Sequence, residues 1–270
     1  MTADASVPLP LPVRRGGPEV MTLRQDRWWT SVVVTVSMLT AFVVYATWAA
    51  FQNRYYYVGA SMHRDLLSPL YSPCIVNACG PGASHGVKLS VWNFSPALLV
   101  LAIPGGFRLT CYYYRRAYYR AFWGSPPACA VTDAHATYTG ETRLPLVLQN
   151  VHRYFFYLAF LVNIVLTIDA VLAFSEPGRG IGVSVGTLVL CVNAALLWLY
   201  TLSCHACRHL CGGGLRSFSD HPLRARLWRW LTPLNARHMQ IAWVSLIVVA
   251  LTDVYVRLVA SGSITDYRLF

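Results

Sequence analysis

A short segment rich in cysteine and histidine follows an apolar run of membrane-spanning length. The segment reads Cys-His-Ala-Cys-Arg-His-Leu-Cys over residues 204–211, and it holds three of the eight cysteines and two of the eight histidines. Thiolate and imidazole are the side chains that bind transition metals and iron–sulfur clusters best. The segment is therefore the first candidate for a metal centre.

Other parts of the chain carry matching side chains to the same end of the predicted helices. Cys111 ends one apolar run, Cys129 lies in the loop that follows, and His152 and His238 begin two later runs. Cytosolic cysteines stay reduced, which favours metal ligation or burial over disulfides. We expect side chains from several helices to meet at one membrane level.

Helix geometry divides the ligands of residues 204–211 into two groups. At about 100° per residue, the three cysteines share one face and the two histidines another, so one centre does not take all five. Two cysteines with two histidines can hold zinc or a Rieske-type 2Fe–2S cluster, and two histidines from different helices could hold a b-type haem. The first predicted ligand group is Cys111, Cys129, His205 and His209, with Cys204 beside them, and the alternates are Cys204 and Cys207 with His152 and His238.

The composition indicates the elements that position these residues. The chain is 56% hydrophobic and 12% charged, whereas a soluble domain has roughly 25% charged residues. Its apolar blocks reach the roughly 20 residues that cross a bilayer as a helix. We predict an all-α integral membrane protein with a Pro-rich tail at 1–27, a five-helix bundle at 28–262 with spans near 28–51, 91–114, 152–174, 182–203 and 239–261, and a final tail at 263–270.

The distribution of basic residues predicts the orientation. One set of connecting segments carries 16 Lys and Arg, and the other set carries 6. Basic segments stay in the cytoplasm, so the N-terminus is expected inside and the C-terminus outside a plasma membrane that the chain crosses several times. The same bias accounts for the net charge of +11, and no nucleic-acid partner is needed to explain it.

Four sequence strings resemble one known family. They are Cys-Tyr-Tyr-Tyr-Arg-Arg-Ala-Tyr-Tyr-Arg at 111–120, Pro-Pro-Ala-Cys at 126–129, Leu-Gln-Asn-Val-His-Arg-Tyr at 148–154 and Cys-His-Ala-Cys-Arg-His at 204–209. Together they resemble the single, cytochrome b-like membrane anchor of actinobacterial succinate dehydrogenase or fumarate reductase, respiratory complex II. The resemblance covers roughly residues 25–262.

The resemblance implies a subunit that supplies the quinone site and does not itself oxidise succinate. It would dock a flavoprotein and an iron–sulfur subunit on its cytoplasmic face and pass their electrons to a quinone, menaquinone, through a metal centre near that face. The resemblance is also compatible with assembly of the complex into a higher oligomer. Related anchors carry b-type haems, and some members of the group replace haem with a cluster. The many cytoplasmic-side cysteines favour a Rieske-type 2Fe–2S cluster, with haem b as the alternative.

A quinone needs an apolar, aromatic slot with one or two hydrogen-bond donors. Suitable side chains near the cytoplasmic boundary are Tyr119, Trp123, His152, Arg153, Trp228 and His238. Two other functions are compatible with an apolar helical chain. A stand-alone helical transporter is disfavoured because no inverted repeat is evident. The second alternative function is that of a zinc-bearing membrane protein. The sequence contains no His-Glu-x-x-His motif, which disfavours a hydrolytic zinc protein.

The opposite side of the predicted bundle carries a second set of candidates. Cys74 and Cys79 lie in a loop closed by turn-forming residues and are expected to form a disulfide outside the cytoplasm, with a metal pair as the alternative. Asp253 has Arg257 four residues later, on the same helix face, as an expected ion-pair partner. Asp169 has no such cation on its helix, and could serve a proton path or a second quinone pocket.

Overall fold

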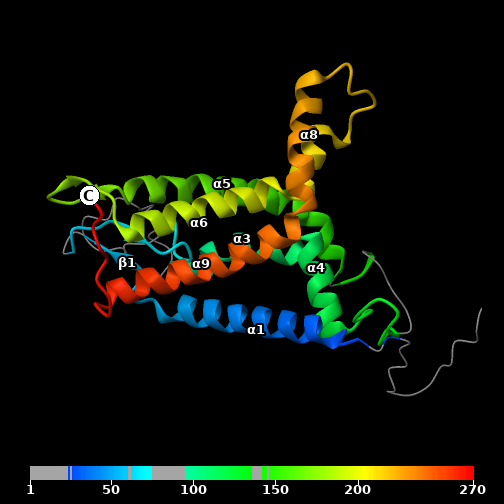
Figure 1. Cartoon of the computed structure of the whole chain (residues 1–270), viewed down its shortest axis with the longest axis horizontal. Helices are drawn as coiled ribbons and strands as arrows, with labels where there is room; N and C mark the ends of the chain where they lie inside the picture. The colour runs from blue at the N-terminus through cyan, green and yellow to red at the C-terminus, as the bar shows by residue number, and fades with distance from the viewer. Residues whose placement is uncertain (1–23, 25, 60–61, 75–94, 136–141, 145) are drawn as a thin grey trace, which may run out of the picture.

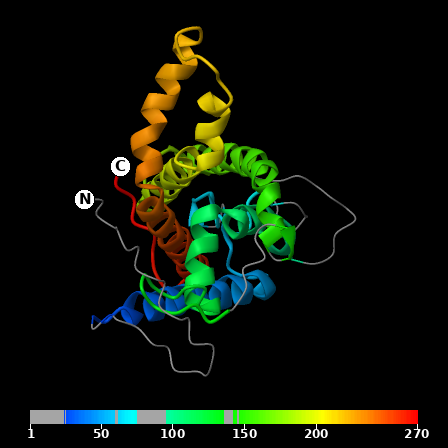
Figure 2. The ribbon, with the colours of Figure 1, turned by 90° about the vertical axis from the view of Figure 1, so that its right-hand side faces the viewer.

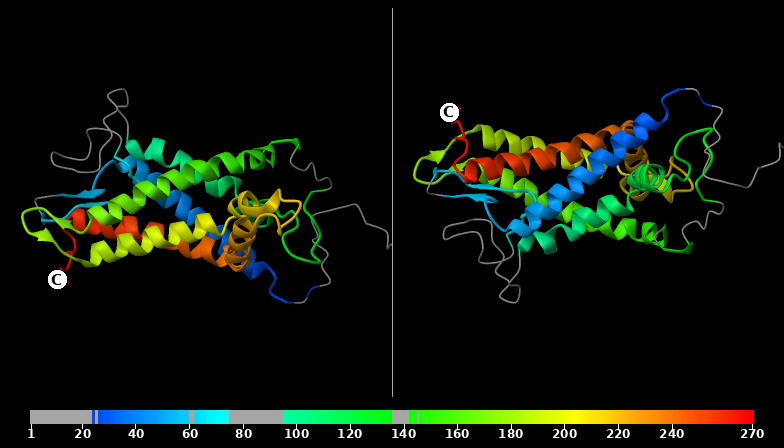
Figure 3. Two further views of the ribbon diagram at one scale, coloured as in Figure 1. Left: turned by 90° about the horizontal axis from the view of Figure 1, so that it is seen from above. Right: turned by 90° about the horizontal axis from the view of Figure 1, so that it is seen from below.

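The computed structural model describes residues 24, 26–59, 62–74, 95–135, 142–144 and 146–270. Within these residues, four helices are long and apolar enough to cross a membrane, and they lie side by side (Figures 1 and 3). They are α1 (Trp29–Gln52), α5 (His152–Leu172, preceded by the 3-10 turn η4, Leu146–Val151), α6 (Val185–Leu202) and α9 (His238–Ala260). Each agrees within a few residues with a predicted span.

The predicted second span differs from the other four. Residues 91–94 lie outside the described residues, and the rest forms α2 (Pro96–Val100) and α3 (Ala102–Thr110), an apolar stretch shorter than the four long helices. Cys111 then adopts an extended conformation with φ −62° and ψ 131°. Because this breaks the helix, α4 (Tyr112–Tyr118) leaves across the end of the bundle instead of continuing along it (Figure 1).

Continuous apolar sequence forms the long helices. A few polar contacts between neighbouring helices help to hold them together as a bundle. In α1 only Ala49 and Ala50 are buried, so this helix presents most of its surface outward. A capping box starts α6: the Ser184 side-chain oxygen accepts from the backbone N–H of Thr187, and the Thr187 side-chain oxygen accepts from the backbone N–H of Ser184. Asn163 on α5 donates to the Thr201 hydroxyl on α6 at 2.8 Å. The packed core lies among α3, α5, α6 and α9.

One end of the bundle, here named the strand end, holds two short hairpins and residues 263–270. The hairpins are β1 (Tyr57–Val58) with β2 (Leu66–Leu67), and β3 (Ser175–Glu176) with β4 (Gly180–Ile181), both antiparallel. Buried Arg64 joins them to the C-terminal segment, because it pairs with Glu176 at 2.8 Å and with Asp266 at 2.7 Å. The expected pair of Asp253 and Arg257 is confirmed at 2.6 Å. Asp169 accepts a hydrogen bond from Ser72.

The predicted disulfide falls partly outside the described residues. Cys74 is disulfide-bonded and fully buried. Its expected partner, Cys79, lies among the residues that are not described.

The other end, here named the basic end, carries α4, the π-helical turn η2 (Tyr119–Trp123), α7 (His205–Arg208), the π-helical turn η5 (His209–Gly213) and α8 (Pro222–Ala236). Figures 1 and 2 show α8 projecting beyond the bundle. None of its residues is buried. The sequence analysis predicted a basic segment between the last two spans but did not predict that part of it forms the helix α8. Pro222 at its start favours a helix, because proline fits the first helical turn.

Candidate metal centre

Two buried cysteines stand where helices break. Cys111 separates α3 from α4, and Cys204 separates α6 from α7. Their backbones are alike, with φ −62° and ψ 131° at Cys111 and φ −64° and ψ 144° at Cys204. The two residues are 2% and 1% exposed. Both thiols therefore lie inside the protein, at the level where the bundle meets the basic end.

Two histidines face these thiols from the first positions of the neighbouring helices. His152 begins α5, and its Nε2 lies 3.0 Å from the Cys204 sulfur. His238 begins α9, and its Nε2 lies 3.3 Å from the Cys111 sulfur. Four separate elements thus bring two imidazoles and two thiols together.

A hydroxyl group orients each imidazole. Thr110 donates its hydroxyl hydrogen to the carbonyl of Gly106 at 2.8 Å, and its oxygen lies 2.9 Å from Nδ1 of His152. Ser203 donates to the carbonyl of Tyr200 at 2.9 Å, and its oxygen lies 2.7 Å from Nδ1 of His238. Because each hydroxyl oxygen then accepts from Nδ1–H, the neutral tautomer leaves a lone pair on Nε2, the nitrogen that faces the thiol. Outer-shell partners of this kind prepare a histidine for metal binding.

The surroundings of the two cysteines repeat one pattern. Phe107 and Tyr200 each stand four residues before a cysteine, and a hydroxyl residue directly precedes each one, giving Phe-Arg-Leu-Thr-Cys and Tyr-Thr-Leu-Ser-Cys. Phe107 stacks on His152 with 5.0 Å between the ring centroids, and Tyr200 stacks on His238 with 5.1 Å between the ring centroids. Each motif therefore supports one histidine while its cysteine faces the other. This repeat is a sequence signal that would have indicated the two cysteines, and it contains neither histidine.

Burial sets the protonation of the Cys204 thiol. It raises the pKa of Cys204 well above the ordinary value, and the nearby Cys111 acts in the same direction. The thiol is accordingly neutral at physiological pH. A metal that binds there would displace its proton.

The four donors do not form a site for one ion. Among the residues that the structure describes, no group of three or more His, Cys, Asp or Glu side chains is arranged to hold a single metal ion. The contacts are instead two Cys–His pairs.

The other predicted ligands lie apart from these two pairs. Cys129 is exposed, and its sulfur lies 4.0 Å from a guanidinium nitrogen of Arg120. His209 contacts Arg153 through Nδ1 at 2.8 Å, with the His205 ring 6.3 Å away. Burial lowers the pKa of His205, and His209 and Arg208 add to the effect. Burial raises the pKa of Cys207 to about 11, with a further contribution from Cys211.

The six predicted quinone residues occupy three places. Tyr119 and Trp123 stack on each other at 5.5 Å on η2. Trp228 lies on α8, and the guanidinium carbon of Arg208 lies over its ring, 3.8 Å from the ring centroid. The other three, His152, Arg153 and His238, line one groove of about 840 Å³, which Cys204, His205 and His209 also line. This groove leads from the surface of the basic end to the Cys–His pairs.

Comparison with known proteins places the chain in a family. The family model for the actinobacterial succinate dehydrogenase subunit SdhC matches residues 30–262. A chain of the solved "Mycobacterium smegmatis Sdh1 complex in the apo form" is similar at 50% sequence identity, with a TM-score of 0.86 over 95% of this chain and 97% of that one. No curated protein matches the chain. The chain belongs to the actinobacterial SdhC family, the membrane subunits of succinate dehydrogenase.

Proposed function

We propose that this protein passes electrons from succinate oxidation to a membrane quinone through a centre held by Cys111, Cys204, His152 and His238. The observation that carries the proposal is the pair of buried contacts between Nε2 of each histidine and the thiol of a cysteine from another element, at 3.0 and 3.3 Å. The flavoprotein and iron–sulfur subunits of the complex would dock at the basic end.

A Rieske-type 2Fe–2S cluster fits this donor set better than a haem. Such a cluster takes two cysteines and two histidines and supplies one-electron transfer. A bis-histidine haem needs two imidazoles that face each other across the iron, whereas here each Nε2 faces sulfur. The Thr110 and Ser203 hydroxyls hold the imidazoles with a free lone pair on that nitrogen.

The basic end has the charge expected of a docking surface for acidic partners. Exposed Arg224, Arg226 and Arg229 follow one another along α8. Complementary charge steers association and fixes orientation. The groove beside this surface leads to the Cys–His pairs, so electrons from a docked subunit would enter there. The excess of basic residues supports a cytoplasmic position for this end.

The ligand assignment can be tested in the purified complex with His152→Ala and His205→Ala as a matched pair. Both residues line the groove, but only His152 contacts a buried cysteine. We expect His152→Ala to abolish an EPR signal of low average g in the succinate-reduced complex. His205→Ala should keep the signal.

Three other results would contradict the proposal. Loss of the signal in His205→Ala but not in His152→Ala would favour the ligand group first predicted from the sequence. Sharp absorption bands on reduction would indicate haem b. Zinc in the purified complex, with neither signal, would remove the electron-transfer role.

A further inference from the structure

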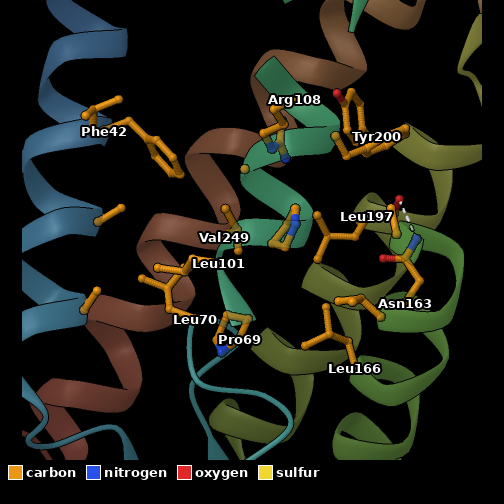
Figure 4. Close-up of a pocket in the computed structure, with 18 of the residues that line it drawn as sticks. Phe42, Pro69, Leu70, Leu101, Arg108, Asn163, Leu166, Leu197, Tyr200 and Val249 are labelled. Atoms are coloured by element: carbon orange, nitrogen blue, oxygen red, sulfur yellow. Dashed lines mark hydrogen bonds between the residues drawn. The ribbon is translucent and has the colours of Figure 1, made fainter. Parts of the chain in front are cut away.

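The helix α8 takes no part in the interior of the bundle. That interior encloses a cavity of about 320 Å³, which is lined by residues of helices that include α1, α3, α5, α6 and α9, with Phe107 and Tyr200 among them (Figure 4). No residue of α8 lines this cavity, and no residue of α8 is buried. What the surface of α8 contacts therefore lies outside the bundle.

The axis of α8 lies across the direction of the membrane-spanning helices. Figures 1 and 2 show that α8 crosses this direction at the level where α6 ends and α9 begins, and that it extends past the edge of the bundle. Because spanning helices run close to the membrane normal, α8 runs along the membrane surface. It therefore lies at the level of the lipid headgroups of the leaflet at the basic end.

An apolar stripe runs along one side of α8. It consists of Leu223, Leu227 and Trp230, whose exposed fractions are 69%, 42% and 73%. These residues are four and three positions apart, a spacing that places side chains on one helix face. A contiguous row of large apolar side chains on a protein surface marks a place that contacts lipid or another protein.

A different side of α8 packs against α7, η5 and the end of α6. The guanidinium carbon of Arg208 lies 3.8 Å from the ring centroid of Trp228, and its Nε donates to the hydroxyl of Thr232 at 3.2 Å. The side-chain amide of Asn235 donates to the carbonyl of Ser203 at 2.9 Å. These contacts fix the rotation of α8 about its own axis, and with it the direction of the apolar stripe.

The hand of the helix sets where the stripe points. Figure 2 views the molecule from the basic end, with α8 running down toward the bundle and η5 on its right. An α-helix is right-handed, with about 3.6 residues per turn. A helix that turns Trp228 and Thr232 toward η5 therefore turns the stripe away from η5 and away from the viewer, toward the lipid. Arg229 stands roughly 130° from the stripe around the helix and points to the aqueous side.

The charge of α8 suits an anionic lipid surface. Its 15 residues include Arg224, Arg226 and Arg229 and contain no Asp or Glu. Arg224 and Arg226 stand on either side of the stripe, where an arginine stem can lie on acyl chains while its guanidinium reaches the phosphate layer. A guanidinium binds phosphate through two parallel hydrogen bonds. Basic helices with leucine and tryptophan on the remaining face lie in the plane of the membrane interface.

We propose that α8 lies in the headgroup layer of an anionic phospholipid leaflet, with the apolar stripe among the acyl chains and Arg224 and Arg226 on phosphate groups. Arg229, on the aqueous side, stays available to the docked subunits. The inference does not depend on the Cys–His centre or on its electron-transfer role. The competing occupant of the stripe is one of the docked subunits, and the experiment distinguishes the two.

The test places a benzophenone photo-crosslinking amino acid at single positions of the whole complex, held in nanodiscs of phosphatidylglycerol and phosphatidylcholine. We expect the probe at Leu227 to form lipid adducts, detected by mass spectrometry, as a probe at Val44 should, a residue that is 62% exposed on the spanning helix α1. The probe at Arg229 is the matched control on α8 and should form about tenfold fewer lipid adducts, because it lies on the aqueous side.

Three results would overturn the proposal. One is adducts between the probe at Leu227 and the flavoprotein or iron–sulfur subunit, which would make a protein the occupant of the stripe. The second is an equal yield of lipid adducts from Leu227 and Arg229. The third is the absence of lipid adducts at Leu227 in complexes where Val44 forms them.

Amide hydrogen exchange gives a second measurement that needs no variant. At low salt, we expect residues 222–230 to exchange about fivefold more slowly in nanodiscs that contain phosphatidylglycerol than in phosphatidylcholine alone, the effect of one arginine at an anionic surface. High salt should remove the difference. Residues 175–181 at the strand end are the control and should exchange alike in both lipids. Equal exchange of residues 222–230 in the two lipids would overturn the assignment of an anionic lipid to this helix.

Discussion

The two ends of the bundle differ in the burial and pairing of their arginines. At the strand end, Arg64 is 5% exposed and lies between Glu176 and Asp266, and Arg257 is 7% exposed and paired with Asp253. At the basic end, the arginines of α8 are exposed, and Arg224 donates to the backbone carbonyls of Cys211 and Leu210. The strand end pairs its buried arginines with carboxylates of the same chain. The arginines of α8 form no ion pair with a carboxylate among the residues that the structure describes.

This contrast indicates what each end contributes to the protein. Buried ion pairs tie loops to helices and are costly to break, because one partner would stay charged without compensation. Exposed arginines contribute little to folding and more to the rate and specificity of association. We therefore expect changes at the strand end to affect stability, and changes at the basic end to affect assembly.

Removing Arg64 should have the largest effect. Arg64→Met leaves Glu176 and Asp266 buried without this partner, and we expect a loss of about 3–5 kcal/mol in unfolding free energy. Thermal unfolding of the detergent-solubilised protein measures it. Arg224→Met at the basic end is the control and should change stability by about 0.5 kcal/mol or less. Equal losses in the two variants would remove the contrast between the ends.

Reversing charge at the basic end should slow assembly. Arg226→Glu combined with Arg229→Glu should reduce the association rate with the isolated flavoprotein and iron–sulfur subunits about tenfold at low salt, because electrostatic steering is lost. Surface plasmon resonance over a salt series measures this, and the difference should shrink at high salt. Arg179→Glu, exposed at the strand end, is the control. A comparable slowing there would show that net charge alone decides the rate.

Acid should weaken the strand end through Asp266. Burial alone would raise the pKa of Asp266, but hydrogen bonds from Tyr255, Ser184, the Gly186 N–H and Arg64 outweigh it and hold this pKa below the ordinary 3.8. Its stabilisation is therefore fully present above pH 3.8 and is lost as the pH falls below that value. Unfolding temperatures at pH 5 and pH 3 measure it. Asp266→Asn should have a smaller drop between the two, and an equal drop would contradict this assignment.

Tyr255→Phe should have the smallest effect. It removes a 2.6 Å hydrogen bond to Asp266, while the carboxylate keeps Arg64 and the Gly186 N–H at 2.7 and 2.8 Å. We expect a cost of about 1 kcal/mol at neutral pH, measured by thermal unfolding. Tyr267→Phe, at a side chain that is largely exposed, should cost nothing measurable. A loss as large as that of Arg64→Met would mean that the Tyr255 hydroxyl stabilises the strand end as much as Arg64 does, and would contradict this ranking.

Helix breaks explain why sequence reasoning did not identify the two Cys–His pairs as such. The helical wheel for residues 204–211 assumed one continuous helix, but the chain is extended at Cys204 and π-helical from His209. The grouping by helix face therefore does not hold for Cys207, Cys211, His205 and His209. His152 and His238 are the alternates predicted from the sequence, because the hydropathy pattern places both at helix starts.

The amino-acid sequence by itself determined the four long helices, the family and the asymmetry of charge, because hydropathy, motif strings and arginine counts are local properties. It also indicated that thiols and imidazoles gather at one end. Only the tertiary structure decided which four meet, where α3 stops, and that a cavity lies behind Phe107 and Tyr200. Those outcomes depend on contacts between residues far apart in the chain, such as Thr110 with His152 and Ser203 with His238. No local pattern contains them.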